Sequence, residues 1–87
     1  MRQKMSVVRI EYCRAWKFDS IAARLAEEIK MQYSGKVADI EVVPSELSGI
    51  FDVYLDNELI YSKLKGSGRL PKPGEVEQIL FERLMKK

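Results

Sequence analysis

The hydrophobic positions of the chain recur first with a period of two and then with a period of four. Val8, Ile10 and Tyr12 share one side of the run from residue 7 to residue 12, which predicts a strand with one buried face. Farther along, apolar side chains recur every four residues, which predicts an amphipathic helix. The predicted apolar stripe consists of Ile21, Ala22, Leu25, Ala26, Ile29 and Tyr33.

Residues that favour helix ends flank this stripe. Asp19 or Ser20 is expected to be the N-cap, because a short side-chain oxygen can accept a hydrogen bond from a free backbone N–H. Gly35 is expected to form a left-handed C-terminal cap. A second strand is expected over residues 37–43, ended by Pro44. A strand, a helix and a strand in this order predict two parallel strands with a right-handed crossover.

The next two apolar runs, residues 50–55 and 58–63, flank Asp56-Asn57 and predict a hairpin. Asp and Asn tolerate the positive φ angles that a tight two-residue turn needs. The expected register pairs Val53 with Ile60 and Tyr54 with Leu59 on opposite faces. A loop over residues 64–72 then leads to a last amphipathic helix. Its predicted apolar residues are Val76, Ile79, Leu80 and Leu84, with Phe81 beside them.

The order β-α-β-β-β-α predicts an α+β domain, in the wider α/β class, with one four-stranded mixed sheet and two helices. This is the minimal thioredoxin-like arrangement. A split β-α-β ferredoxin-like fold is the alternative, but it needs a second helix between its third and fourth strands. The tight hairpin therefore favours the thioredoxin-like fold, and the length of 87 residues indicates one domain over residues 1–87.

Composition narrows the classes of function. Hydrophobic residues make up 46% of the chain and charged residues 32%, which is typical of a folded, soluble domain. The net charge of +2 is too small to indicate binding to nucleic acid or to a membrane surface, and no apolar run is long enough to span a bilayer. The chain has no histidine and one cysteine, which excludes a His-activated nucleophile and a Cys/His zinc cluster.

The candidate chemistry centres on Cys13, in the run Tyr-Cys-Arg-Ala-Trp at residues 12–16. It follows the first strand directly, and sites in open α/β sheets form beyond the carboxyl ends of parallel strands. The start of the next helix, Arg14 and Lys17 can each lower the pKa of this thiol. One cysteine cannot form an internal disulfide, and the basic N-terminus has no apolar segment of a signal peptide, so we expect a cytoplasmic protein.

In a purely structural interpretation, Cys13 is a small hydrophobic residue buried in the core. Tyr12 and Trp16 on either side can bury the sulfur, which would raise its pKa and make it inert. Trp16 itself has two interpretations. It is either a packing residue, which holds the first helix turn against the sheet or covers Cys13, or a flat platform beside the thiol for a peptide or for glutathione. These alternatives stay open at this point.

Several short motifs occur in a characteristic order. They are the Tyr-Cys end of the first strand, residues 48–53 (Ser-Gly-Ile-Phe-Asp-Val), the hairpin return at residues 59–63, and Gly-Ser-Gly at residues 66–68. In order and spacing they resemble the selenoprotein W family, a thioredoxin-like redox group that includes selenoproteins T and H. The resemblance runs from residue 7 to about residue 68 and more loosely to the end.

The resemblance implies thiol- or selenol-based redox chemistry with no tightly bound cofactor and with glutathione or a partner-protein thiol as co-reactant. Cys13 matches the first cysteine of the family motif, and Trp16 stands where the family has a second cysteine or selenocysteine. A dithiol enzyme attacks with one thiolate and resolves the mixed disulfide with the other. The chain is thereby restricted to single-thiol chemistry at Cys13, either a mixed disulfide or a sulfenic acid that an outside thiol reverses.

Loss of the resolving residue motivates a second hypothesis. The chain can instead be a redox-inactive thioredoxin-like binding module, with a partner surface around Trp16, Ser48 and Gly49 that Tyr12 and Arg14 flank. A third hypothesis is a structural role in which the unpaired thiol links two chains.

The remaining charged residues give weaker signals. The basic loop that follows the hairpin is either solvated or captures an acidic partner or the carboxylates of glutathione. The acidic residues of the two helices are expected on their polar faces, where they increase solubility. The basic set is Lys63, Lys65, Arg69 and Lys72, and the acidic set is Glu27, Glu28, Glu75, Glu77 and Glu82.

Overall fold

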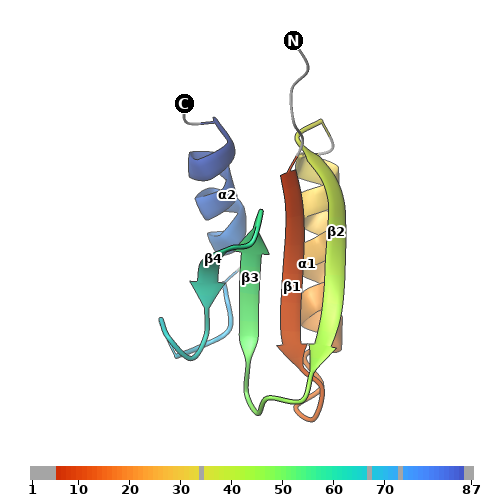
Figure 1. The fold of residues 1–87 in the computed structure, drawn as a ribbon, viewed down its shortest axis with the longest axis vertical. Coiled ribbons are helices and arrows are strands. Elements are labelled where there is room, and N and C mark those ends of the chain that lie inside the picture. The colour runs from red at the N-terminus through yellow and green to blue at the C-terminus, as the bar shows by residue number, and fades with distance from the viewer. Residues whose placement is uncertain (1–5, 34, 67, 73, 86–87) are drawn as a thin grey trace.

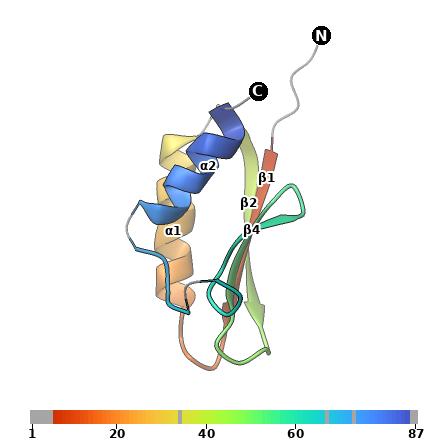
Figure 2. The ribbon, with the colours of Figure 1, turned by 90° about the vertical axis from the view of Figure 1, so that its left-hand side faces the viewer.

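A computed structural model describes residues 6–33, 35–66, 68–72 and 74–85. A four-stranded sheet forms one layer, and two helices cover one of its faces (Figures 1 and 2). The predicted order of elements is confirmed. The elements are β1 (Ser6–Cys13), α1 (Asp19–Gln32), β2 (Val37–Ser45), β3 (Phe51–Leu55), β4 (Glu58–Ser62) and α2 (Glu75–Met85).

The strands lie in the order β2-β1-β3-β4. β1 pairs with β2 in parallel and with β3 antiparallel, and β3 pairs with β4 antiparallel. The predicted mixed sheet is therefore confirmed, with β1 hydrogen-bonded on both sides. Because β1 lies inside the sheet, its last residue is held by neighbours on both flanks.

The core lies between the sheet and the two helices. β1 contributes Val8 and Ile10, which are fully buried, as the alternation of its side chains predicts. The helical stripes supply the opposite side of the core. The buried core residues are Val8, Ile10, Ala22, Leu25, Ile29, Tyr33, Val37, Phe51, Val53, Leu55, Tyr61, Val76 and Leu80.

Among the residues that the structure describes, no helix covers the other face of the sheet (Figure 2). The polar positions of β1 lie there, again as the alternation predicts. Arg9 places its Nε 3.0 Å from Glu11 Oε2, and its guanidinium lies 4.6 Å from the centre of the Tyr54 ring. Such half-exposed pairs stabilise the fold by about 1 kcal/mol or less, so this face contributes less than the core.

The prediction that Pro44 ends the second strand is wrong. β2 continues to Ser45, with Pro44 paired to Tyr12 and Ser45 paired to Cys13. β2 is an edge strand, so a residue in it needs hydrogen bonds on one side only, and edge strands tolerate proline. The extra length brings the backbone of Ser45 beside Cys13.

The predicted N-cap of α1 is also wrong. Phe18 holds that position, without a side-chain cap bond, and Asp19 is already the first helical residue. The Phe18 ring packs edge-on against Phe51 at 6.3 Å between ring centres. Aromatic packing against the core therefore takes the place that a capping carboxylate or hydroxyl was expected to fill.

The left-handed cap predicted at Gly35 does not form, because its φ angle is not in the left-handed range. Tyr33 is the C-cap residue, and its backbone N–H donates to Ile29 O at 2.8 Å. Its carbonyl oxygen accepts hydrogen bonds from the N–H groups of Lys36 and Val37, both at 2.9 Å. These bonds turn the chain directly into β2.

The predicted hairpin turn is confirmed. Asp56 and Asn57 have φ angles of 51° and 71°, as a tight turn between right-twisted strands requires. Asp56 also accepts a hydrogen bond from the Val7 N–H at 2.9 Å through its Oδ1. The turn is therefore attached to the central strand.

The hairpin register is confirmed in part. Tyr54 pairs with Leu59, but Val53 pairs with Tyr61 rather than with Ile60. A bulge between these pairs inserts Ile60 as an extra residue. The shift turns Tyr61 into the core, where it is 8% exposed.

Glu77 departs from the predicted polar face of α2. It is only 9% exposed and lies against α1. Burial raises the pKa of the Glu77 carboxyl, and its hydrogen bond with the Glu28 carboxyl raises it further. The hydroxyl of Tyr33, the C-cap residue of α1, donates to the backbone oxygen of Glu77 at 3.0 Å, so the end of α1 and the start of α2 meet through polar groups here.

The substitution Glu77→Gln is expected to stabilise the protein at neutral pH. A raised pKa means that the folded state holds the Glu77 proton more tightly than the unfolded state. This contribution is complete below the unfolded pKa and is lost as the pH rises through the folded pKa. Glutamine keeps a hydrogen-bonding group without a charge, so we expect a gain of about 1 kcal/mol at pH 7 in urea unfolding, vanishing in acid.

Glu82→Gln is the matched control, because Glu82 is exposed on the same helix. Its effect should stay within about 0.5 kcal/mol at each pH. A Glu77→Gln variant less stable than the parent at pH 7 would contradict the raised pKa of the Glu77 carboxyl.

Candidate functional site

Cys13 lies at the carboxyl end of β1, between the loop that leads to α1 and the loop that joins β2 to β3 (Figure 1). Its backbone N–H donates to Ile50 O at 2.8 Å, and the next N–H, of Arg14, donates to Ser45 O at 3.1 Å. The side chain is 1% exposed. The thiol is therefore fixed beneath two loops, at the predicted edge of the sheet.

The surroundings of the sulfur favour the thiolate. Burial raises the pKa of Cys13, but backbone N–H groups of Gly49, Trp16, Ala15 and Ile50 lower it by more, so the pKa lies below its ordinary value. Hydrogen bonds to a charged acceptor stabilise that charge without any cationic side chain. The interpretation of Cys13 as an inert buried thiol with a raised pKa is not supported.

The source of this effect differs from the prediction. The Arg14 guanidinium points away to Glu46, at 3.3 Å, with its side chain 65% exposed. α1 begins at Asp19, beyond the loop that contains Lys17, and the helix dipole acts mainly within one turn. The backbone of the two loops, rather than the side chains of Arg14 and Lys17, stabilises the thiolate.

Gly49 is required in the second loop for two reasons. Its φ angle of +73° is one that residues with a Cβ rarely adopt. A Cβ at this position would also lie 3.3 Å from Cη2 of Trp16. The close approach of the indole to the backbone therefore needs a glycine, and it connects the loop of Trp16 to the loop of Gly49.

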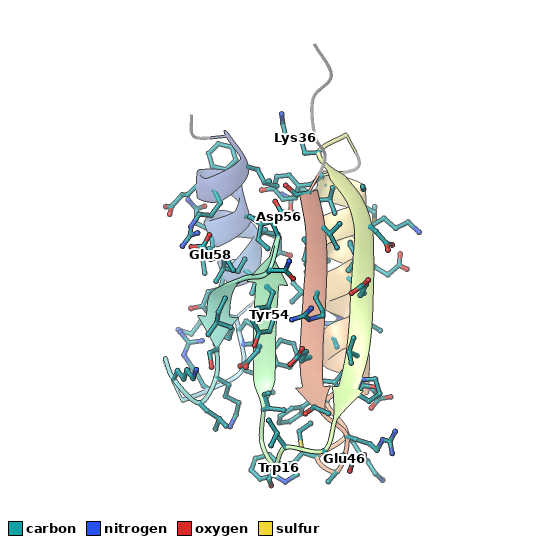
Figure 3. All side chains as sticks on the ribbon, viewed as in Figure 1. Trp16, Lys36, Glu46, Tyr54, Asp56 and Glu58 are labelled. Carbon is teal, nitrogen blue, oxygen red and sulfur yellow. The ribbon has the colours of Figure 1, made fainter. Side chains whose placement is uncertain are left out.

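Trp16 packs against the second loop and is also half exposed. One side of its ring packs on Gly49, yet the residue is 53% exposed. Its ring also meets the Phe18 ring edge-on at 5.8 Å between centres, and Lys63 Nζ lies 5.2 Å from the ring centre. The indole helps to hold the loops over the thiol and presents a fixed aromatic surface at one end of the molecule (Figure 3).

The other predicted site residues lie in different surroundings. Ser48 is exposed in the loop beside Gly49. Tyr12 packs against the hydrophobic core, on the face of the sheet that the helices cover. The structure thus brings Cys13, Trp16 and the loop 48–50 together, and Tyr12 supports them from inside.

The basic loop does not act as one unit. Arg69 pairs with Glu75 of α2 at 2.9 Å, and the Lys72 N–H donates to the same carboxylate at 2.9 Å. Lys63 instead lies over Trp16. The sequence contains no signal for this contact, because it joins residues that only the sheet brings together.

The described residues contain neither a cluster of metal ligands nor a helix that could span a membrane. Among them no three His, Cys, Asp or Glu side chains gather as metal ligands. No helix in the same part of the chain is long and apolar enough to cross a membrane.

Comparison with known proteins gives the family. The model of the Rdx family matches residues 7–82. The chain belongs to the Rdx family. The predicted resemblance to the selenoprotein W group is therefore confirmed at the level of the family, and Trp16 stands three residues after Cys13 in this Rdx-family chain.

Solved structures confirm the thioredoxin-like fold. A selenoprotein W-related protein from Vibrio cholerae superposes with a TM-score of 0.85 at 18% identity, over 93% of this chain and 99% of that one. A protein from Bordetella parapertussis superposes with a TM-score of 0.86, also at 18% identity, over 93% of this chain and 100% of its own. At this identity the likeness concerns the fold. Comparison with curated protein sequences gives no significant match.

Gly49→Ala is expected to destabilise the protein by more than Gly68→Ala. Both glycines have left-handed φ angles, +73° and +79°, but only Gly49 has a side chain within 4 Å of the added Cβ. The backbone term is about 1–2 kcal/mol for each, and displacement of Trp16 adds to it at Gly49 alone. Urea unfolding measures the difference, and the fluorescence of Trp16 should change in Gly49→Ala only. Equal stabilities and unchanged fluorescence in both variants would show that the indole does not depend on Gly49.

Proposed function

We propose that this Rdx-family protein is a single-thiol redox protein in which Cys13 forms mixed disulfides with glutathione or with a partner-protein thiol. The observation that carries the proposal is the set of backbone N–H groups that lowers the pKa of a thiol at the carboxyl end of β1. A lowered pKa increases the thiolate fraction, and the thiolate is the nucleophile. The absence of histidines and of a second cysteine leaves Cys13 as the reacting thiol.

The reaction is a thiol–disulfide exchange. The Cys13 thiolate attacks the glutathione sulfur of a mixed disulfide between glutathione and a partner-protein thiol, a new S–S bond forms, the old one breaks, and the partner leaves as a thiolate that takes a proton from water. A second glutathione thiolate attacks the glutathione sulfur of this new mixed disulfide. Cys13 then leaves as a thiolate, and the same N–H groups that favour its attack favour its departure.

Trp16 explains why the resolving step needs an outside thiol. The position that would supply a second sulfur carries an indole instead, so the mixed disulfide persists until glutathione or another thiol reaches it. Glutathione is then a co-substrate rather than a bound cofactor. Such a protein needs a reducing environment, and we expect it to act in the cytoplasm.

The rate of alkylation of Cys13 by iodoacetamide as a function of pH tests the thiol. The apparent pKa should lie below the free-cysteine value of about 8.5, because the backbone N–H groups stabilise the thiolate. Intact mass after treatment with glutathione disulfide should then show one glutathionyl group, removable by excess reduced glutathione. Cys13→Ser is the control and should show neither reaction. An apparent pKa at or above the free-cysteine value would refute the proposal that the Cys13 thiol is activated as a nucleophile.

Removal of the indole should increase access to the sulfur. Cys13 is 1% exposed, so the two loops must separate before a large reagent reaches it, and Trp16 connects these loops through Gly49. We expect Trp16→Ala to raise the alkylation rate at fixed pH by roughly tenfold, equivalent to about 1.4 kcal/mol of loop opening. Trp16→Phe, which retains an aromatic ring, should lie between. An unchanged rate in Trp16→Ala would mean that the indole does not control access.

A binding module without redox turnover is the second candidate function. Two observations favour it, namely that Cys13 is buried while Trp16 is 53% exposed. The two functions differ in their dependence on sulfur. A module that only binds keeps its partner in the Cys13→Ser variant, whereas a redox protein loses the covalent adduct and its turnover.

A further inference from the structure

The end of the molecule that holds Cys13 carries exposed apolar side chains. Trp16, Leu47 and Leu64 are 53%, 64% and 59% exposed. Leu47 lies in the loop of Gly49, on which the indole packs, and Leu64 follows Lys63, whose Nζ lies over the indole. We call these three residues the Trp16 surface. Large apolar side chains that are exposed on neighbouring loops are typical of a contact surface.

Basic residues lie in the loops beside this surface. Lys63 Nζ lies 5.2 Å from the centre of the indole, and Lys17 and Lys65 are exposed in the loops of Trp16 and Leu64. Among the described residues, the ion pairs are those of Arg9, Arg14, Arg69 and Arg83, so none of them neutralises these three lysines. Glu46 lies at the same end of the molecule (Figure 3) but pairs with Arg14 at 3.3 Å, so the positive charge of the lysines is complemented by a carboxylate of a partner.

The indole is already held in place. The outer atoms of its six-membered ring pack on Gly49, the Phe18 ring meets it edge-on, and Lys63 Nζ lies 5.2 Å from the ring centre, while the residue stays 53% exposed. A side chain that is fixed before binding loses little conformational entropy when a partner covers it. Tryptophan also belongs to the residues that contribute most binding energy per side chain at protein interfaces. The Trp16 surface is therefore preorganised to bind an apolar side chain.

A protein segment fits these observations better than a nucleic acid does. Single-stranded nucleic acids stack successive bases on several aromatic side chains along a basic groove. Here Trp16 is the exposed aromatic residue beside the lysines, and the net charge of the chain is only +2. One apolar platform with lysines around it matches one apolar side chain with carboxylates around it.

We propose that the Trp16 surface docks an acidic protein segment, with an apolar side chain of the segment on the indole and its carboxylates on Lys63, Lys17 and Lys65. The inference rests on the proposed function and deepens it, because a segment docked here brings a cysteine of its own toward Cys13. The partner is thereby an acidic protein segment. Trp16 binds this segment at the position where the resemblance expects a second cysteine or selenocysteine.

Two short synthetic peptides without cysteine test the docking. One has a phenylalanine flanked on both sides by glutamates, and the other has lysines in place of the glutamates. Trp16 is the only tryptophan of the chain, so its fluorescence reports binding directly. The acidic peptide should bind about tenfold more tightly than the basic one or better, and its affinity should fall as salt is added.

The charge reversal Lys63→Glu should weaken binding of the acidic peptide by about tenfold, the effect of one charge-assisted contact. Lys36→Glu is the matched control, because Lys36 is exposed at the opposite end of the molecule from Trp16 (Figure 3). It makes the same change in net charge and should leave binding unaltered. For Trp16→Ala, anisotropy of a fluorescein-labelled acidic peptide replaces the tryptophan signal, and binding should be lost.

The outcomes separate docking from redox chemistry. Because the peptides have no thiol, Cys13→Ser should bind them as the parent does. If the peptide binds but Cys13 is not glutathionylated, the proposed redox function is contradicted and the docking inference stands. If Cys13 is glutathionylated but the peptide does not bind, the docking inference is contradicted and the redox function stands. Three results would overturn the inference: equal affinity for both peptides, equal effects of Lys63→Glu and Lys36→Glu, or tighter binding of an oligothymidylate than of the acidic peptide. A Trp16-dependent dimer in sedimentation would also overturn it, by assigning the surface to a second copy of the chain.

Discussion

The position of β1 inside the sheet is the constraint on which the site depends. A strand with neighbours on both sides has its backbone direction fixed to its last residue, and that residue is Cys13. The hydrogen bond from Cys13 N to Ile50 O continues this attachment past the end of the regular pairing with β3. The chain must therefore turn over the sulfur on one side and approach it on the other, and the N–H groups of both turns reach the thiol.

This arrangement combines burial of Cys13 with a lowered pKa of its thiol. A thiol that is 1% exposed would ordinarily have a raised pKa, because burial disfavours the charged form. Backbone N–H groups reverse that effect and cost little exposure, since they are already part of the turns. The same turns need the positive φ angle and the missing side chain of Gly49. Gly49 thus allows the conformation of the loop, the packing of the indole on the loop backbone, and the approach of the N–H groups that stabilise the thiolate.

Trp16 belongs to the loop beside the thiol rather than to the core of this Rdx-family chain. Its indole packs on the backbone of Gly49, so it connects the two loops without entering the space between the sheet and the helices. Its exposed side is then available for binding, with Lys63 as its charged neighbour.

The sequence by itself determined the order and type of the elements, the Asp56-Asn57 turn and the place of Cys13. These features depend on periodicity and on backbone preferences, which act over a few residues. Tertiary structure decided the rest. Pro44 fits because β2 lies at an edge, the bulge near Ile60 follows from packing of the hairpin on the core, and Glu77 is buried because α1 and α2 meet there. The stabilised thiolate and the contact of Lys63 with the indole belong to the same class, because each joins groups that are distant in the chain and that only the folded sheet brings together.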